Sequence, residues 1–388
     1  MIDTQQSSRL SWSAKALLWL LLVVVLPLLT VELAMIVLEP YLSTGVYEYD
    51  PDIGFRVRPH AMGSNQFGFN DKDYPLQPPP GTFRILILGD SFGWAGGKEG
   101  NYTALLRGQL SAGPDGDRIE VINASYPMTH TGEQLLMLKK YGLQYNPQLL
   151  VLGFFAGNDF ADADPNRKRI VVNDIYIDID KRKEVTLFGY PLVPQSRLLS
   201  FAKQKYKIFR ETRASSLMGR AQQQSASEGT FSEDTFLLIE RSRMEFCNLK
   251  AYRQGKDAAN IDYIFQSVRE MRDLLRTRGI PLFVAIFPDE FQVNEQLTDT
   301  IFRRFKLERD DYDLELMQKL LKTFLDSEKI PYVDLLERFR EAGKRESLYA
   351  LRDTHWNEAG NRLAAEILRE RLSGAVRTYF TSGVASIQ

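Results

Sequence analysis

The chain has 388 residues, 44% of them hydrophobic and 26% charged, an ordinary globular composition for roughly one to three domains. Its 49 basic and 50 acidic residues give a formal net charge of −1, which gives no support to nucleic-acid binding by the chain as a whole. A single cysteine, Cys247, excludes an internal disulfide and a multi-cysteine metal site. A total of 3 histidines argues against a multi-histidine centre. We expect no metal ion, no cofactor and no nucleic-acid partner.

The N-terminal part contains an apolar segment, Ala16–Leu38, whose one charged residue is Glu32. A bilayer core requires about 20 apolar residues, so this segment predicts a transmembrane helix with Glu32 near one interface. Arg9 and Lys15 precede the segment and acidic residues follow it, which places the N-terminus in the cytoplasm. The alternative is a cleaved signal peptide, for which the run is long and lacks a small-residue cleavage site. We expect a single-pass inner-membrane anchor and a periplasmic main domain.

Beyond the proline-rich boundary at Pro78–Pro80, short apolar runs alternate with helical patterns. Continuous apolar runs of this length are typical of strands that helices bury on both faces. The expected strands are Arg84–Leu88, Ile119–Asn123, Leu149–Phe155, Pro281–Phe287 and Pro331–Asp334. The expected helices are Asn101–Ser111, Gly132–Gln144, Ile261–Arg278, Tyr312–Ser327 and Ala359–Leu372. This alternation predicts an α/β fold with a doubly wound, flavodoxin-like parallel sheet.

The stretch 161–256 interrupts the alternation after the third strand, so we interpret it as an insertion. It begins with alternating residues that predict a hairpin, continues through a basic helical region and includes a polar loop, Ala221–Thr235. The expected organisation is a cytoplasmic tail (1–15), an anchor (16–38), a linker (39–80), the first part of the α/β domain (81–160), the insertion (161–256), the second part of that domain (257–373) and a C-terminal tail (374–388).

Polar residues follow the expected strands at the points where they end. In an open parallel sheet, ligands bind beyond the carboxyl ends of the strands, so these residues are expected to converge on one edge. They are the segments Gly89–Gly93, Asn123–Pro127, Ala156–Asp159 and Asp353–Asn357.

The residue types in these segments fit nucleophilic acyl transfer. A serine hydroxyl needs an adjacent base, and His355 is the candidate base for Ser91, with Asp353 to orient its ring. A tetrahedral intermediate needs hydrogen-bond donors for its oxyanion. The candidate donors are the backbone N–H groups of Ser91 and Ser125 and the side-chain amide of Asn158.

Five further residues are candidates for substrate binding. Trp94 and Trp356 flank the proposed nucleophile and base, where their rings either stack on sugars or pack in the core. Asp289 and Gln292 follow the fourth strand, where they contact substrate hydroxyls if the site extends that far. His130 either approaches the site or belongs to a loop surface.

Gly-Asp-Ser at 89–91, Gly-Asn-Asp at 157–159 and Asp-Thr-His at 353–355 occur in an order that resembles the SGNH (GDSL) hydrolase superfamily. The resemblance covers about half of the chain, Phe83–Asp159 and Ile261–Leu372. The string Asp-Thr-His-Trp at 353–356 is also similar to the acid–histidine motif of alginate O-acetyltransferase-like proteins. The resemblance implies that the nucleophile, base, acid partner and oxyanion donor are Ser91, His355, Asp353 and Asn158.

The chain departs from the superfamily pattern at two places. The second block usually carries a glycine as oxyanion donor, and Ser125 is the residue that we align with it. The lipolytic members usually place aspartate three residues before histidine, whereas Asp353 stands two residues before His355. The shorter spacing is compatible with the acyltransferase-like motif.

The resemblance implies a serine esterase or O-acyltransferase that handles acyl groups, above all O-acetyl groups, on a cell-surface or secreted polysaccharide. One alternative is a non-catalytic SGNH-fold scaffold or glycan-binding component of a polysaccharide assembly or secretion complex. Another is a lipase or thioesterase at the membrane surface. The expected partners are the acylated carbohydrate, the membrane and, for a transferase, a membrane acyl-supplying or polysaccharide-secretion protein.

Overall fold

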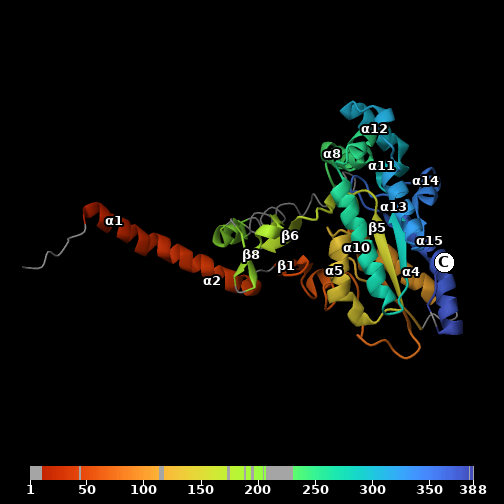
Figure 1. The fold of residues 1–388 in the computed structure, drawn as a ribbon, viewed down its shortest axis with the longest axis horizontal. Coiled ribbons are helices and arrows are strands. Elements are labelled where there is room, and N and C mark those ends of the chain that lie inside the picture. Colours follow the sequence, from red (N-terminus) through yellow and green to blue (C-terminus); the bar gives the residue numbers. More distant parts are fainter. Residues whose placement is uncertain are drawn as a thin grey trace, which may run out of the picture. The chain divides into compact units, whose positions relative to one another are not determined.

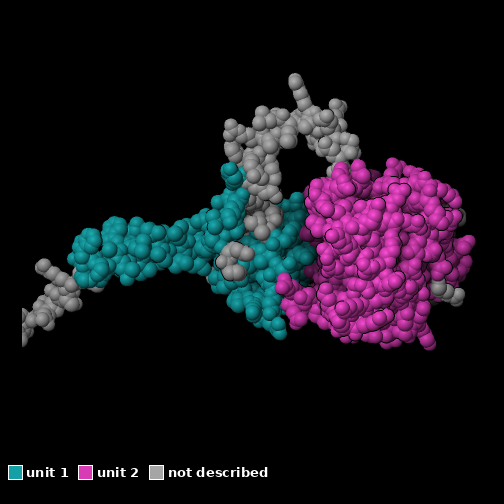
Figure 2. All heavy atoms as spheres, turned by 90° about the horizontal axis from the view of Figure 1, so that it is seen from above, with its two compact units in different colours: residues 1–55, 168–219 teal, residues 56–167, 220–388 magenta. Residues whose placement is uncertain are grey.

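The computed structural model describes residues 11–42, 45–112, 118–172, 175–187, 189–193, 196–203, 205–206, 230–383 and 385–387. The chain divides into two compact units, coloured differently in Figure 2. The smaller unit comprises residues 1–55 and 168–219, and the larger one residues 56–167 and 220–388. Residues 1–10 of the expected cytoplasmic tail and 221–229 of the expected polar loop lie outside the described residues.

A five-stranded sheet forms the centre of the larger unit, with the strand order β11-β10-β5-β3-β4 and parallel pairing throughout. This order, in which the chain starts centrally and turns back once, is the flavodoxin-like doubly wound topology. The predicted fold class is confirmed. The strands differ from the predicted runs at their first residues only, and they are β3 (Phe83–Leu88), β4 (Ile119–Asn123), β5 (Leu149–Phe155), β10 (Leu282–Phe287) and β11 (Tyr332–Asp334).

Helices cover both faces of the sheet. Helices α4 (Tyr102–Ser111) and α15 (Glu358–Ser382) contact each other and share one core cluster with apolar side chains of β3. Helices α5 (Thr131–Lys140) and α10 (Ala258–Arg276) contact each other and lie on the other side, in front of β5 in Figure 1. Because successive strand residues point to opposite faces, a strand covered on both sides is buried at every position, as β3 is, and five of its six residues are apolar.

The last helix corrects the expected C-terminal tail. Helix α15 continues from Glu358 to Ser382, past the expected boundary at residue 373, and Ala375 and Val376 are buried. Tyr379 packs on Phe83 with ring centroids 4.8 Å apart. Residues 374–382 therefore belong to the α/β domain, because they cover the first strand of its sheet.

The expected insertion is not a single module. Residues 168–219 belong to the smaller unit, and residues from 220 onward belong to the larger one. There, α8 (Glu233–Met244) and α12 (Glu295–Phe305) contact each other and share an apolar cluster of their own. Further helices of the larger unit are α3 (Gly97–Gly100), α6 (Asp159–Asp162), α8 (Glu233–Met244), α9 (Leu249–Arg253), α11 (Glu290–Val293), α12 (Glu295–Phe305), α13 (Leu316–Ser327) and α14 (Leu336–Gly343).

The expected linker 39–80 contains ordered structure that is part of both units. Strand β1 (Tyr47–Asp50) pairs with β2 (Gly54–Val57). Farther along, Phe69 and Tyr74 are buried, and the Tyr74 hydroxyl donates a hydrogen bond to the Val121 carbonyl in β4 at 3.1 Å. This part of the chain is thus built into the larger unit rather than leading up to it.

The smaller unit begins with an apolar helix, Trp12–Leu38, that is long and apolar enough to span a membrane. It consists of α1 (Trp12–Leu20), a π-helical turn (Leu21–Val25) and the start of α2 (Leu26–Leu42). Such a helix at this position has the properties of either an anchor or a signal sequence. The predicted hairpin region forms two two-stranded sheets, β6 (Arg167–Val172) with β7 (Ile175–Asp180) and β8 (Val185–Leu187) with β9 (Tyr190–Leu192).

Candidate active site

Three side chains from opposite ends of the larger unit's sequence meet in a hydrogen-bonded chain. Ser91 begins the 3₁₀ turn Ser91–Gly93 that follows β3, and its Oγ lies 2.8 Å from His355 Nε2. His355 Nδ1 lies 2.7 Å from Asp353 Oδ1. With the proton on Nδ1, the ring donates to Asp353 and accepts the Ser91 hydroxyl proton. The structure therefore brings together the three residues that the sequence analysis assigned to one site.

The turn that presents Ser91 is capped by its neighbour Asp90. The Asp90 carboxylate accepts a hydrogen bond from the Phe92 N–H at 3.0 Å, which holds the turn against the end of β3. Burial raises the pKa of Asp90 to about 6, against the opposing effect of the Phe92 hydrogen bond and of the charges on His355 and Arg243. Asp90 is thus a structural cap under the nucleophile, as its place in the Gly-Asp-Ser motif suggests.

We expect the variant Asp90→Asn to change how stability depends on pH. A carboxyl whose pKa is higher in the folded than in the unfolded state favours folding below its unfolded pKa of about 3.9 and loses this contribution as pH rises through the folded value. The free energy of unfolding of the wild type, relative to Asp90→Asn, should therefore fall by ~2 kcal/mol between about pH 4 and pH 7. Urea unfolding at both pH values measures this difference.

The amide of the variant still accepts the Phe92 N–H hydrogen bond, so the comparison isolates the ionisation of Asp90. The His355→Ala variant removes the histidine charge that acts on Asp90. The same pair of measurements in that background therefore reports on Asp90 without this charge. A wild-type minus variant difference that stays constant with pH would contradict the expectation.

The loop that carries the acid and the base is a turn closed by a bridge between Tyr349 and Trp356. Within it, Arg352 and Thr354 adopt the left-handed conformation, with φ of 50° and 72°, on either side of Asp353. Non-glycine residues seldom adopt this conformation, so contacts with the surroundings must stabilise the turn. It is anchored by Trp356, which packs on Phe92 with ring centroids 4.6 Å apart.

Asp353 and His355 are partly accessible, each with 28% of the side chain exposed. The pKa of Asp353 is lowered, chiefly by the hydrogen bond from His355 and further by one from Thr230. The carboxylate therefore stays ionised at neutral pH, the form that stabilises a protonated imidazole.

The second strand exit is built differently from the expectation. Ser125 is buried, and its backbone N–H donates to Asn123 Oδ1 at 3.1 Å, so this N–H already has an acceptor. The amide of Asn123 in turn donates to the Gly93 carbonyl at 2.7 Å. Asn123 therefore joins the second strand exit to the nucleophile turn, and the geometry does not support the predicted role of Ser125 as an oxyanion donor.

Gly93 is required by this close approach of the two loops. A Cβ atom at position 93 would lie 2.5 Å from both Cβ and Oγ of Ser125, a distance that carbon side chains do not reach. The Trp94 indole donates to the Ser125 carbonyl at 2.9 Å, and Trp94 is half-buried. Trp94 thus lies beside the nucleophile turn with part of its surface accessible, as a substrate-binding residue would.

Asn158 begins helix α6 after β5, and it is half-buried. Its amide donates to Asp162 Oδ2 at 2.9 Å. An amide carries two N–H groups, so this bond leaves donor capacity for a second acceptor. The structure is compatible with the predicted role of Asn158.

The structure overturns four of the five predicted substrate-binding residues, all because they are buried. Trp356 is 2% exposed and lies in the core. Asp289 is fully buried, where it caps α11 through the Glu290 N–H at 2.7 Å. Gln292 is 6% exposed, and its Oε1 accepts the Asp289 N–H at 2.9 Å, which completes the same helix cap. Its amide donates to Gln318 Oε1 at 2.8 Å.

His130 is also a structural residue. Its Nδ1 accepts the Gly132 N–H at 3.1 Å, and with Glu133 it forms the capping box at the start of α5. At 6% exposed it is not part of a surface loop either. Serine or threonine is the usual residue at such a helix cap. The sequence therefore gives no sign that a histidine at this position caps a helix rather than belonging to an active site.

Arg243 is a residue near the site that the sequence analysis did not find. It comes from α8, its guanidinium lies 5.0 Å from the Phe155 ring centroid, and it pairs with Asp289 and Glu240 at 3.4 and 3.2 Å. Its charge also acts against the burial that raises the pKa of Asp90. In the sequence it is one basic residue among many in the expected insertion.

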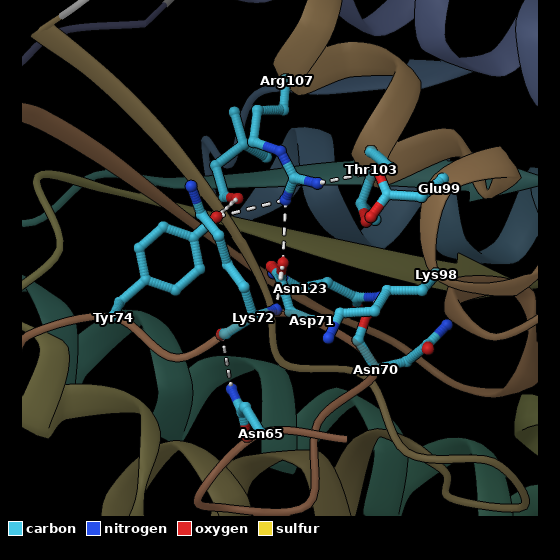
Figure 3. Close-up of polar contacts among 12 residues, drawn as sticks. Asn65, Asn70, Asp71, Lys72, Tyr74, Lys98, Glu99, Thr103, Arg107 and Asn123 are labelled. Carbon is cyan, nitrogen blue, oxygen red and sulfur yellow. Dashed lines mark hydrogen bonds and ion pairs between the residues drawn. The ribbon is translucent and has the colours of Figure 1, made fainter. Parts of the chain in front are cut away.

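Polar and ionic contacts join residues 65–74 to Arg107 of α4 and to Asn123 at the end of β4, and Figure 3 shows these side chains. Asp71 is 1% exposed and binds Arg107 Nη1 at 2.8 Å and the Asn123 N–H at 2.9 Å. The neighbouring Asn70 amide donates to the Gly93 carbonyl at 3.1 Å. The segment before the first strand therefore helps to hold both loops that surround Ser91.

Within the described residues, no group of three or more His, Cys, Asp and Glu side chains is placed to bind a metal ion.

The α/β domain, with its parallel five-stranded sheet and the side chains of Ser91, His355 and Asp353 in one hydrogen-bonded chain, has the arrangement that the sequence resemblance to the SGNH hydrolases implies. Residues 246–383 match the family model described as SGNH hydrolase-like domain, acetyltransferase AlgX. This part of the chain is thus similar to the SGNH hydrolase-like domain of the AlgX acetyltransferase family, in agreement with the resemblance seen in the sequence. The matched residues include Asp353 and His355, whereas Ser91 precedes them.

Several solved structures are similar to the chain. The acetyl xylan esterase AlAXEase has 14% identity and a TM-score of 0.40, over 74% of this chain and 98% of that one. A catalytic mutant of Axe2, an acetylxylan esterase from Geobacillus stearothermophilus, has 14% identity and a TM-score of 0.40, over 75% and 94%. A putative lipolytic protein of the G-D-S-L family from Desulfitobacterium hafniense has 12% identity and a TM-score of 0.37, over 74% and 99%. The curated proteins compared with the sequence gave no match.

Proposed function

We propose that the chain is a serine esterase or O-acetyltransferase in which Ser91 is the nucleophile, His355 the general base and Asp353 its partner. The observation that carries the proposal is the continuous chain of hydrogen bonds from Asp353 through His355 to Ser91, at 2.7 and 2.8 Å. A serine hydroxyl is unreactive near neutral pH, and this arrangement is the one that activates it.

The reaction proceeds in two steps with one proton carrier. Ser91 Oγ attacks the ester carbonyl carbon while its proton moves to His355 Nε2, and the tetrahedral intermediate collapses as His355 returns that proton to the departing alcohol. The acyl group is then an ester on Ser91. A second hydroxyl, from water or a sugar, gives its proton to His355 and attacks this ester, and His355 reprotonates Ser91 as it leaves.

The oxyanion donors that we propose are the Ser91 backbone N–H and the Asn158 side-chain amide. The Asn158 amide gives one hydrogen bond to Asp162 Oδ2 at 2.9 Å, and its second N–H is the one that we assign to the oxyanion.

The substrate class that we propose is an O-acetylated polysaccharide. The AlgX family match supports it, since that family is described as an acetyltransferase. The half-buried Trp94 beside the nucleophile turn offers a ring face of the kind that stacks on sugars. Transfer to a sugar would need an acetyl-supplying membrane partner.

Purified full-length protein in detergent tests the proposal with nitrophenyl acetate, with and without acceptor oligosaccharides. Acetyl groups that appear on the sugar identify a transferase, and nitrophenol release without sugar acetylation identifies an esterase. A steep preference for long acyl chains would point to a lipase or thioesterase instead. Folded protein with neither turnover nor labelling of Ser91 by a fluorophosphonate would support the scaffold alternative.

We also propose that the N-terminal helix is retained as a single-pass anchor, with the larger unit in the periplasm. Glu32 of α2 accepts hydrogen bonds from the Ser196 hydroxyl at 2.8 Å and the Leu198 N–H at 3.2 Å, both in the same unit. A carboxylate in an apolar helix is costly unless it is paired. Cleavage of the helix would remove the acceptor of these donors, so the contacts favour retention.

The mass of the mature protein, measured after expression with the native N-terminus, distinguishes the two fates of this helix. We expect the full-length mass and recovery in the membrane fraction. A mature chain that begins after residue 38 would overturn the proposal. Glu32→Gln should keep the full-length mass, since it retains the acceptor oxygen for Ser196 and Leu198.

A further inference from the structure

The acid of the site is contacted by a segment from outside its own loop. Thr230 Oγ1 donates a hydrogen bond to Asp353 Oδ2, the carboxylate oxygen that does not face His355. Thr230 N–H donates to the Leu351 carbonyl at 3.2 Å, and Phe231 N–H donates to the Arg352 carbonyl at 3.0 Å. The segment 230–231 thus lies along the acid loop as a short strap with both backbone and side-chain contacts.

The acid loop is a place where such support matters. Asp353 stands between Arg352 and Thr354, both with left-handed backbone, and a β-branched residue such as threonine rarely adopts that conformation. The strap contacts the carbonyl groups of the loop on the N-terminal side of Asp353. It therefore limits the movement of the loop at the residues where its backbone is least favourable.

The strap itself is fixed to a packed part of the unit. Phe231 packs against the apolar cluster that includes Phe236 of α8 and Ile301 of α12. Directly after it, the Ser232 hydroxyl caps α8 by accepting the Thr235 N–H at 3.3 Å. The hydroxyl of Thr230 is thus held by a rigid neighbour rather than by a free chain end.

We propose that Thr230 is a positioning residue of the site, which acts through Asp353: its hydroxyl orients the carboxylate so that the other oxygen meets His355 Nδ1. This inference rests on the proposed function. It means that a residue from the expected insertion, more than a hundred positions before the acid in the chain, is needed for full activity. One carboxylate oxygen of Asp353 then binds the His355 ring, and the other binds the Thr230 hydroxyl of the strap.

The test is steady-state kinetics of the full-length variants Thr230→Val and Thr230→Ser with nitrophenyl acetate. Valine keeps the shape of threonine and removes the hydroxyl, while serine keeps the hydroxyl. We expect Thr230→Val to lose about tenfold in kcat with KM unchanged, since one hydrogen bond to a charged group is removed and the substrate is not touched. Thr230→Ser should stay within about twofold of the wild type.

Two control variants separate positioning from general loosening. Ser232→Ala removes the cap of α8 but leaves the contact with Asp353, and Thr300→Val removes an exposed helix hydroxyl that bonds within α12. Both should keep wild-type kcat. Wild-type kcat in Thr230→Val, no recovery in Thr230→Ser, or an equal loss in Ser232→Ala would each overturn the inference.

A second readout does not depend on turnover and so separates this inference from the proposed function. The Nδ1 proton of His355, assigned by its loss in His355→Ala, should give a downfield NMR signal that moves in Thr230→Val and returns in Thr230→Ser. One outcome is that the wild type shows no Ser91-dependent turnover while the signal still moves in Thr230→Val and returns in Thr230→Ser. In that case the proposed function fails and the positioning role stands. A signal that is identical in Thr230→Val overturns the positioning role.

Discussion

Ser91→Ala is expected to reduce the hydrolysis of nitrophenyl acetate by at least about a thousandfold in kcat, since it removes the atom that would form the acyl-enzyme. His355→Ala should cause a loss of the same order, because without a base 2.8 Å from the hydroxyl Ser91 stays protonated. The double variant should be no worse than either single one, since residues that act as a unit are not additive. Initial rates and fluorophosphonate labelling of each variant measure this.

Ser125→Ala is the matched control for this experiment. Ser125 is a buried serine beside the same turn, and its contacts with Asn123 and Trp94 are made by its backbone. We expect it to retain most of the activity and all of the labelling. Equal activity of Ser91→Ala and the wild type, with both proteins folded, would exclude the serine mechanism.

Asp71→Ala is expected to be the most destabilising single change in the loops around the site, by about 3–5 kcal/mol. It leaves the Arg107 guanidinium, which is 19% exposed, without its partner at 2.8 Å, and it leaves the buried Asn123 N–H without an acceptor. The change should also disturb the Asn123 amide and so the Gly93 turn. Urea denaturation gives the free energy of unfolding, and activity should fall with it.

Glu99→Ala provides the internal comparison, because Glu99 pairs with the same Arg107. That carboxylate is 84% exposed and lies 3.9 Å from Nη2, so its loss should cost less than ~1 kcal/mol. If Asp71→Ala costs no more than Glu99→Ala, the network does not support the turn as we describe. The pKa of Asp71 is raised because burial outweighs the charge of Arg107, which also means that Asp71→Asn is the milder variant.

The strands and the order of the chemical residues are properties that the sequence expresses directly. A strand buried on both faces is nearly all apolar, so β5 and, apart from Arg84, β3 were visible as apolar runs. Parallel strands end on one edge of the sheet, so the polar residues after them had to converge there. Ser91 follows β3 directly, whereas α14 stands between β11 and His355, so the 2.8 Å contact of the two residues also depends on the loop that carries His355.

Burial of single polar or aromatic residues was the main source of error. Asp289 and Gln292 follow β10 and Trp356 follows the candidate base, places where substrate-binding residues also stand, yet all three are core or cap residues. The difference depends on which helices cover each exit, and α8, α11 and α14 were not predicted. Neither the type of a residue nor its position along the chain shows whether a helix covers the strand exit where it stands.

The sequence by itself determined the apolar N-terminal helix, the parallel sheet and the three residues that meet at its edge. It determined these because hydrophobic periodicity and strand direction are local properties with a fixed geometric consequence. Only the tertiary structure decided that the Asn123 amide binds the Gly93 carbonyl, that Asp71 binds the Asn123 N–H, and that Thr230 reaches Asp353. These contacts join segments far apart in the chain, and a hydrogen bond between such segments depends on packing that no single segment encodes.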